Sequence, residues 1–329
     1  MAAKKPKNVI DRMLTLELVR VTESAAIAAS KHIGHGREKA ADQAAVDAMR
    51  RELNYLDING EIVIGEGERD EAPMLFIGEK VGTGKGPKLD IALDPLEGTT
   101  LTAKAKADAM TVMAMARRGA LLHAPDVYMD KIAIGPGYPP GLIDLDVSPK
   151  ENIARLADAK GVAMKRIRAC ILDRPRHADL IRQVRECGVS ISLISDGDIA
   201  GIIRTTEPST GIDIYMGIGG APEGVLAAAA LRCIGGQMQG RLVTTNAEQK
   251  GRAKRMGIKD VHAKIPLEGM VGEDVFFSAT GVTDGSMLAG VHRSGKVKTT
   301  HSIVMRSSSG TVRWIRTRHG PGFNKKESN

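Results

Sequence analysis

The sequence predicts an α/β protein made of two α/β subdomains. Three patterns in its 329 residues support this class. Amphipathic helices precede short apolar strands in the first third, short β-type runs alternate with helical stretches in the middle, and strands joined by turns follow residue 275. Strands that alternate with helices are typical of βαβ units, in which helices cover a largely parallel sheet.

The first third begins with two predicted helices. Residues 11–33 and 41–56 carry apolar side chains three and four residues apart, so each helix has one apolar face. Asn59-Gly60 is a turn signal that precedes the first of three short apolar runs, and each of these runs predicts a strand. These runs are residues 62–64, 89–93 and 111–116.

The rest of the chain alternates between strands and helices and then ends in strands. The end, from residue 275 to 318, includes the turn Arg293-Ser294-Gly295-Lys296 and predicts antiparallel strands. A Gly- and Pro-rich segment at residues 135–149 predicts the boundary between the subdomains, residues 1–145 and 146–329. In the middle we expect strands at 168–172, 189–194 and 212–216 and helices at 176–187, 197–204 and 222–232.

The composition is that of a globular protein. Hydrophobic residues make up 42% and charged residues 26%, and no apolar run approaches the roughly 18 residues of a membrane span, so we expect no membrane partner. Cys170, Cys187 and Cys233 lie far apart without a CxxC motif, which is typical of a reducing compartment. The N-terminus has no signal-peptide pattern, and we expect a cytoplasmic location.

The net charge of +8 raises the possibility of a nucleic-acid partner. The positive excess lies in residues 1–20 and 295–329, however, and the segment between them is slightly acidic. Aromatic residues are 3% of the chain, so stacking platforms for bases are scarce. We therefore expect no nucleic-acid partner, and a nucleic-acid-binding protein that uses its basic ends is the alternative from a different class of function.

The sharpest chemical signal is the run DPLEGTT, which begins at Asp94 directly after a predicted strand. Pro95 favours an extended Asp94, so the strand should run up to this carboxylate and the turn should bring Glu97 back beside it. Gly98 leaves room for a phosphate near backbone N–H groups, and a helix that starts at Thr99 would direct its positive end at that anion. An ordinary strand-to-helix turn with acidic caps would account for the same run.

Three further acidic features favour a metal site. Residues 65–71 place four carboxylates within six residues, and a divalent cation would relieve their repulsion. Glu223 lies in the first turn of one predicted helix and Asp42 near the start of another, where either could also be an ordinary first-turn acid or cap. Sites whose ligands are carboxylates suit Mg²⁺ or Mn²⁺.

Two polar turns in the second half could bind the rest of a ligand. Arg174-Pro175-Arg176-His177 and Asp196-Gly197-Asp198 each follow a predicted strand, where α/β sheets present ligand-binding groups. Arginines suit a second phosphate and aspartates suit sugar hydroxyls. Both segments could also be ordinary polar turns.

Together, these motifs resemble those of class II fructose-1,6-bisphosphatases of the GlpX type, which belong to the lithium-sensitive phosphatase superfamily. The resemblance spans residues 12 to about 318 and keeps the order of the motifs. Glu97 stands where most of the superfamily has a second Asp, as in the class II relatives. The matching motifs are VTESAA (21–26), AAD (40–42), IVIGEGERDEAPML (62–75), DPLEGT (94–99), APDVYMDK (124–131), RPRH (174–177), DGD (196–198), GIGGAPEG (217–224) and FSATG (277–281).

The resemblance implies a layered α/β/α/β/α sandwich of the sugar-phosphatase type, with a metal-binding phosphatase domain in residues 1–145 and a sugar-phosphate-binding domain in residues 146–329. It implies hydrolysis of the C1 phosphate of D-fructose 1,6-bisphosphate to fructose 6-phosphate and phosphate, in gluconeogenesis or Calvin-type carbon metabolism. An enzyme that also cleaves sedoheptulose 1,7-bisphosphate is the nearest alternative. It further implies Mn²⁺ or Mg²⁺, with more than one ion per site, and a homodimer or homotetramer.

The resemblance also implies roles for individual residues, carried over motif by motif. Thr99 would position the attacking water, with Glu66 and Asp94 as the other catalytic residues. The implied metal ligands are Asp42, Glu66, Asp94, Glu97 and Glu223. The implied substrate contacts are Glu97, Gly98, Thr99, Tyr128, Arg174, Pro175, Arg176, Asp196, Gly197, Asp198 and Gly220.

Overall fold

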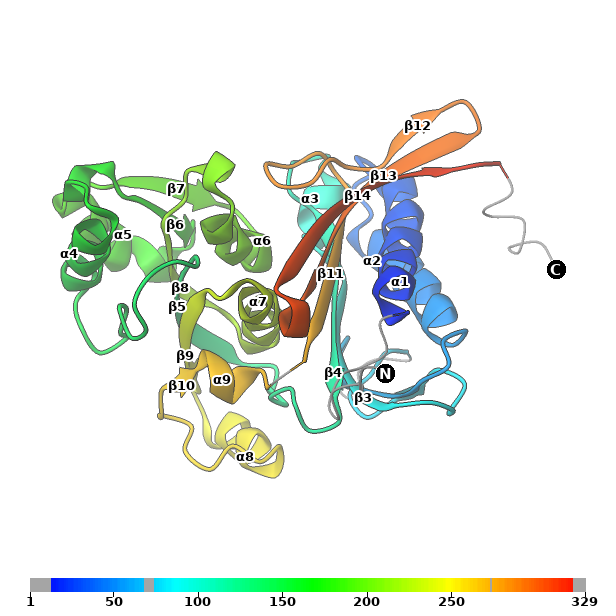
Figure 1. The fold of residues 1–329 in the computed structure, drawn as a ribbon, viewed down its shortest axis with the longest axis horizontal. Coiled ribbons are helices and arrows are strands. Elements are labelled where there is room, and N and C mark those ends of the chain that lie inside the picture. The colour runs from blue at the N-terminus through cyan, green and yellow to red at the C-terminus, as the bar shows by residue number, and fades with distance from the viewer. Residues whose placement is uncertain (1–12, 68–73, 273, 322–329) are drawn as a thin grey trace, which may run out of the picture.

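The computed structural model describes residues 13–67, 74–272 and 274–321, in which two β-sheets and several helices pack in alternating layers (Figure 1). The first sheet takes its strands from both ends of the chain, in the order β12-β13-β11-β4-β3-β1-β2, with β14 also paired to β13. β1 and β3 run parallel and therefore end at the same edge. The strands are β1 (Asn59–Ile64), β2 (Lys80–Val81), β3 (Lys88–Glu97), β4 (Met110–Arg117), β11 (Phe276–Gly281), β12 (His292–Ser294), β13 (Val297–Arg306) and β14 (Thr311–His319).

The second sheet has the strand order β10-β9-β5-β8-β6-β7. β6 runs parallel to β7 and β8, whereas β5 is antiparallel to β8 and β9. The ends of β6, β7 and β8 and the start of β5 therefore lie at one edge. The strands are β5 (Tyr128–Ile134), β6 (Arg168–Leu172), β7 (Ser190–Ile194), β8 (Ile214–Gly220), β9 (Gln237–Val243) and β10 (Ile265–Pro266).

Helices form three layers around the two sheets. α1 and α2 cover the outer face of the first sheet, α7 lies between the sheets beside α6, and α4 and α5 cover the outer face of the second sheet (Figure 1). This order confirms the layered α/β/α/β/α sandwich. The helices are α1 (Leu14–Ala29), α2 (Glu38–Leu53), α3 (Thr99–Ala103), α4 (Pro149–Lys160), α5 (Ala178–Glu186), α6 (Asp198–Ile203), α7 (Ala221–Ile234), α8 (Ala247–Arg255) and α9 (Leu267–Met270).

The central helix α7 is apolar on nearly all sides, which explains its place between the sheets. Its sequence APEGVLAAAALRCI is rich in alanine, and Val225 and Leu231 are fully buried with these alanines. A helix that is apolar all round needs partners on both faces. A Cβ at Gly224 would lie 2.8 Å from the sulfur of Met129 in β5, so α7 and the second sheet are in close contact.

The predicted helices and strands are present, with ends that differ by a few residues, and the predicted turn at residues 293–296 joins β12 to β13. The expected end of β3 is wrong. This strand does not stop at Asp94 but continues to Glu97, through an irregularity in its pairing with β4 between these residues. Pro95 lacks an N–H for the strand ladder, which explains the irregularity.

The proposed boundary between the subdomains stays a prediction. β5 lies before residue 145 and belongs to the second sheet, while β11 to β14 lie after it and belong to the first. In the ranges that the structure describes, no helix is long and apolar enough to cross a membrane. Cys170, Cys187 and Cys233 are free thiols.

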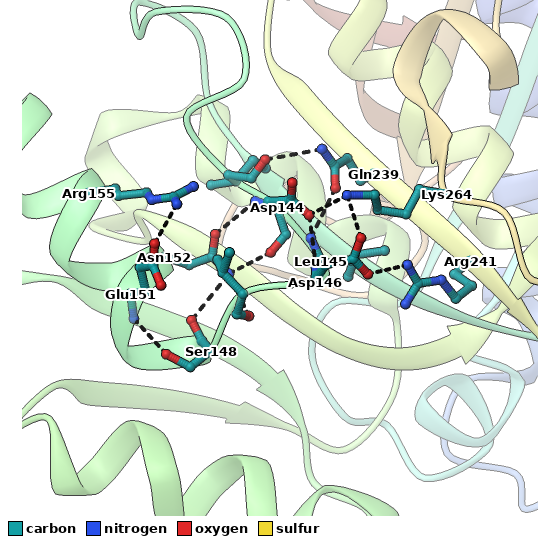
Figure 2. A network of polar contacts seen from close by, with 12 residues as sticks. Asp144, Leu145, Asp146, Ser148, Glu151, Asn152, Arg155, Gln239, Arg241 and Lys264 are labelled. Carbon is teal, nitrogen blue, oxygen red and sulfur yellow. Dashed lines mark hydrogen bonds and ion pairs between the residues drawn. The ribbon is translucent and has the colours of Figure 1, made fainter.

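The segment that was expected to separate the subdomains is tied to the second sheet (Figure 2). Lys264 contacts Asp144 and Asp146, each at 2.6 Å, and Arg241 of β9 also pairs with Asp146. The hydrogen bond from Lys264 lowers the pKa of both aspartates. The segment is therefore fixed to the edge of the second sheet and is not a free linker.

Candidate active site

The carboxylates predicted as metal ligands converge where the first sheet meets the central helix. Asp42 comes from α2, Glu66 follows β1, Asp94 and Glu97 lie in the last residues of β3, and Glu223 lies in the first turn of α7. Each carboxyl group is close enough to another to change its pKa. Segments far apart in the sequence thus bring these side chains into one cluster.

Asp42 and Glu66 share a hydrogen bond at one side of the cluster. Burial raises the pKa of Glu66 to about 8, and the charge of Asp42 adds to this shift. Burial also raises the pKa of Asp42, although the hydrogen bond with Glu66 opposes that change. Near neutral pH the pair therefore retains a proton, which a bound cation would displace.

Asp94 occupies the centre of the cluster. Burial raises its pKa well above the ordinary value, and the charges of Glu66 and Glu223 add to the effect. Its Oδ1 accepts a hydrogen bond from the backbone N–H of Leu96 at 3.0 Å, which fixes the side chain at the irregular end of β3. Asp94 is therefore held in place, and its ionised form is unfavourable unless a cation is nearby.

Glu97 connects the first sheet to α6. Its Oε1 accepts a hydrogen bond from the backbone N–H of Ile199 at 2.8 Å, while its Oε2 is buried and has no hydrogen-bond partner among the described residues. The side chain is 4% exposed. Burial, followed by the charges of Asp198 and Asp94, raises the pKa of Glu97 well above its usual range. One of its oxygens is thus available to a ligand.

Glu223 offers a second unsatisfied oxygen. Its Oε2 is buried without a hydrogen-bond partner within the part of the chain that the structure describes. Burial raises its pKa to about 7; Asp198 adds to the shift and Lys131 opposes it. A Cβ at Gly220 would lie 1.7 Å from this Oε2, so only glycine leaves room for the carboxylate in this position.

The cluster fits a divalent cation, although the side chains do not form a ready-made metal centre. Across residues 13–67, 74–272 and 274–321, no group of three or more His, Cys, Asp or Glu side chains is arranged to hold a metal ion. The free oxygens of Glu97 and Glu223 and the mutual repulsion of the carboxylates nevertheless match a hard cation. Of the predicted acidic run, Glu66 joins the cluster, and residues 68–71 lie outside the described residues.

A cavity of about 210 Å³ opens beside the cluster. Glu66, Asp94 and Glu223 line it, and so does Asp126, from the loop before β5. The sequence alone does not mark Asp126 as a site residue, because no strand is predicted near it. Its place in the APDVYMDK motif was the available signal.

The arginine turn lies at the facing edge of the second sheet. Arg176 donates hydrogen bonds to the carbonyl of Ile218 at 2.9 and 2.7 Å, and its guanidinium lies 4.7 Å from the centre of the Tyr128 ring. Arg174 lies 3.8 Å from Asp196. Tyr128 is 49% exposed, the side chain of Arg174 is 37% exposed, and Arg176 is exposed as well. All three side chains are therefore accessible to a ligand.

The two segments that contain Gly98 and Gly197 come close to the cluster. Gly197 and Gly98 have φ angles of +81° and +85°, which favour glycine. A Cβ at Gly197 would lie 3.9 Å from Glu97 Oε1, so the sugar-side loop approaches the carboxylates directly. Thr99 follows Gly98 at the start of α3 and is partly buried. Of the other predicted substrate contacts, Pro175 begins the turn after Arg174 and Gly220 pairs with Tyr128.

His177 holds the arginine turn in place, a role that the sequence did not reveal. Its Nδ1 lies 2.7 Å from the carbonyl of Leu172 and donates to it, while its Nε2 accepts a hydrogen bond from the backbone N–H of Ile218 at 2.7 Å. The ring is 1% exposed. Since one ring nitrogen donates and the other accepts, this arrangement requires the neutral imidazole.

Acidification should weaken this arrangement. Burial lowers the pKa of His177, whereas an unfolded chain keeps the ordinary histidine value of about 6.5. The unfolded state therefore binds the proton more readily, and the stabilisation by His177 is lost as the pH falls below the unfolded value. The difference in unfolding temperature between the parent and His177→Gln should shrink from about pH 7.5 to about pH 5.5, as followed by circular dichroism. A constant difference would contradict the assignment.

The structure combines a carboxylate cluster that suits cations with an arginine turn that suits phosphate, on a layered α/β/α/β/α sandwich. These features define a phosphatase that acts on phosphorylated sugars. The family described as bacterial fructose-1,6-bisphosphatase, glpX-encoded, matches residues 12–319, and the chain belongs to this family. The resemblance found from the motifs is thus confirmed.

Individual relatives give the same result. The chain is 44% identical over 322 residues to fructose-1,6-bisphosphatase 1 class 2 of Escherichia coli strain K12, an alignment that covers 94% of this chain and 95% of that protein. Fructose-1,6-bisphosphatase class 2 of Shigella flexneri gives the same values. Among solved structures, the inositol monophosphatase from Anabaena (Nostoc) sp. PCC 7120 aligns with a TM-score of 0.32 and 11% identity, over 59% of this chain and 71% of that chain.

Proposed function

We propose that this chain hydrolyses the C1 phosphate of D-fructose 1,6-bisphosphate, giving fructose 6-phosphate and phosphate, and that it uses Mn²⁺ or Mg²⁺. The observation that carries the proposal is the pairing of a buried carboxylate cluster with an arginine turn on the facing sheet. A sugar bisphosphate needs a cation site for the phosphate that reacts and an anion site for the phosphate that does not. Membership of the family supports the same substrate.

The carboxylates divide between metal binding and catalysis in this proposal. More than one ion is expected, and bound ions would supply charge neutralisation for the phosphate and acidify the attacking water. The hydroxyl of Thr99 would hold that water in line with the phosphate, and Glu66 and Asp94 would fix its orientation. The residues that would hold the ions are Asp42, Glu66, Asp94, Glu97 and Glu223.

The second sheet would bind the sugar and its other phosphate. Arg174 and Arg176 would hold the phosphate that is not cleaved, and this contact would orient the reacting end. Asp196 and Asp198 would accept hydrogen bonds from sugar hydroxyls. The remaining substrate contacts would be Glu97, Gly98, Thr99, Tyr128, Pro175, Gly197 and Gly220.

The test is release of inorganic phosphate from a panel of sugar phosphates with Mn²⁺ or Mg²⁺. We expect the highest kcat/KM for fructose 1,6-bisphosphate, and the panel includes sedoheptulose 1,7-bisphosphate and an inositol monophosphate. No metal-dependent release from any of them would refute the proposal. A salt-dependent gel shift with DNA or RNA, together with no phosphatase activity, would instead favour a nucleic-acid-binding protein.

Three further predictions from the sequence are proposals here. We propose a homodimer or homotetramer, which light scattering distinguishes, and a cytoplasmic location, which cell fractionation tests. We also propose that residues 1–145 supply most of the metal site and that residues 146–329 supply most of the sugar site. The exceptions would be Glu223 for the metal site and, for the substrate contacts, Glu97, Gly98, Thr99 and Tyr128, because these residues lie on the other side of this boundary.

Mn²⁺ should stabilise the folded protein in the absence of substrate. An ion that binds only the folded state adds about 2.7 kcal/mol at a hundred times its Kd. We expect the unfolding temperature to rise with Mn²⁺ and to fall again when EDTA is added. Because the ion competes with protons on carboxyl groups whose pKa is raised, as for Glu66 at about 8, the increase should be larger at about pH 8 than at about pH 6. Equal effects of Mn²⁺ and Na⁺ at matched ionic strength would contradict a specific site.

A further inference from the structure

Lys131 is a buried cation beside the acidic cluster to which the proposed function gives no role. It lies on β5 and is 0% exposed. Its ammonium pairs with Asp198 Oδ2 and donates a hydrogen bond to the carbonyl of Gly220 at 2.8 Å. Its positive charge opposes the rise in the pKa of Glu223 that burial and Asp198 cause. Such a buried ammonium is unfavourable unless it is closely paired, so its position depends on these contacts.

The backbone packs closely against the side chain of Lys131 at two glycines. A Cβ at Gly219 would lie 2.0 Å from Asp198 Oδ2 and 2.9 Å from Lys131 Nζ. A Cβ at Gly224, in the first turns of α7, would lie 3.2 Å from Lys131 Cδ. Glycines on β8 and α7 therefore let the backbone pack closely against the lysine, and a side chain at Gly219 would displace the ammonium or Asp198.

The two partners of Lys131 belong to different segments of the site. Asp198 begins α6 at the end of the sugar-side loop, and Gly220 ends β8 directly before the helix that carries Glu223. In this part of the described structure, one ammonium thus connects the two segments. Their separation sets where a sugar hydroxyl can meet Asp198.

We propose that Lys131 is a positioning residue for the sugar: by holding Asp198 and Gly220 together, it fixes the sugar-side loop against the start of α7. This inference rests on the proposed function, in which both partners contact the substrate. Lys131 forms no hydrogen bond with the free oxygens of Glu97 and Glu223. Its loss should therefore reduce sugar affinity more than the rate of the chemical step.

The first test compares Lys131→Met with the parent and with Lys165→Met, which removes an exposed lysine elsewhere. In the ligand-free protein, Lys131→Met should increase amide hydrogen exchange in residues 197–203 and 218–224. By calorimetry it should weaken binding of fructose 6-phosphate by about 10- to 100-fold, as expected for one lost buried charge contact. Mn²⁺ affinity should not decrease, because a neighbouring positive charge opposes cation binding.

Three outcomes would overturn the inference. Unchanged hydrogen exchange in residues 197–203 and 218–224 would overturn it, whichever compound the substrate proves to be. Parental affinity for fructose 6-phosphate would do so directly. A joint loss of Mn²⁺ binding, sugar binding and unfolding temperature would show that Lys131 is needed for folding alone. By contrast, absence of phosphate release from the parent would refute the proposed function and leave the exchange test of Lys131 intact.

A second set of variants applies if Lys131→Met does not fold. Lys131→Arg keeps the charge but displaces it, and Asp198→Asn removes the partner's charge. If Lys131 acts through Asp198, the effects of these two substitutions on fructose 6-phosphate affinity should not add in the double variant. Additive effects would overturn the inference.

Discussion

Asp94→Asn should lower kcat/KM for fructose 1,6-bisphosphate by about 1,000-fold, the loss expected when a central electrostatic group is removed from an active site. Asparagine keeps the side-chain oxygen that accepts from the N–H of Leu96, so the local geometry should survive. An amide oxygen is neutral, however, and is a weaker ligand for a hard divalent cation than a carboxylate. The loss should therefore appear in catalysis and in Mn²⁺ affinity together.

The same substitution should stabilise the metal-free protein. Because burial and the neighbouring carboxylates raise the pKa of Asp94, its ionisation is less favourable in the folded state than in the unfolded chain. Ionisation of Asp94 destabilises the folded protein once the pH rises above the pKa of this residue in the unfolded chain. At neutral pH, Asp94→Asn should therefore unfold at a higher urea concentration than the parent. Asp158→Asn, on the exposed face of α4, is the matched control and should change neither property. Full activity of Asp94→Asn would contradict the proposed role of Asp94 in metal binding and catalysis.

Thr99→Ala should lower kcat by about 100-fold, at the lower end of what a group that positions a proton transfer contributes. The methyl group of alanine cannot hold a water, but it leaves the backbone of α3 and the neighbouring Glu97 unchanged. Binding of fructose 6-phosphate should stay within about threefold of the parent, since Thr99 is one of many proposed substrate contacts and the others remain.

Two variants make this measurement specific. Thr99→Ser keeps the hydroxyl and should recover most of the turnover, whereas Thr100→Ala removes the hydroxyl of the next residue and should have little effect. Steady-state kinetics with saturating Mn²⁺ gives kcat and KM for each variant. Near-normal turnover in Thr99→Ala would exclude Thr99 from the reaction.

Local patterns predicted most elements of the fold because burial leaves a period in the sequence. The runs at residues 168–172 and 190–194 are strands for this reason. β5 was not predicted, because Asp130 and Lys131 interrupt its apolar run. Lys131 is buried there only because it pairs with Asp198, which lies 67 residues away in the sequence. No local pattern could have revealed that contact.

In the candidate site too, local sequence patterns predict some residues, whereas others depend on contacts that only the fold creates. The motifs select the carboxylates that the structure brings together, because each lies near the end of a strand or the start of a helix. His177, Asp126 and Lys131 were missed as contributors, since each depends on a neighbour brought near by the fold. His177, for example, accepts its hydrogen bond from Ile218, 41 residues away. The pKa of Glu66 also could not be predicted, because Asp42 approaches it from another layer.

The late strands β11 to β14 matter for how this protein is made. Thr22 of α1 forms hydrogen bonds with Ser278 and Thr280 of β11, at 3.1 and 2.8 Å. During synthesis on the ribosome, α1 and β4 emerge well before these partners. Their apolar faces therefore stay exposed while most of the chain is synthesised. A chain cut short after α9 would contain each candidate metal ligand yet lack the strands that complete the sheet beneath them. Loss of the last part of the gene should therefore inactivate the enzyme as surely as loss of a ligand.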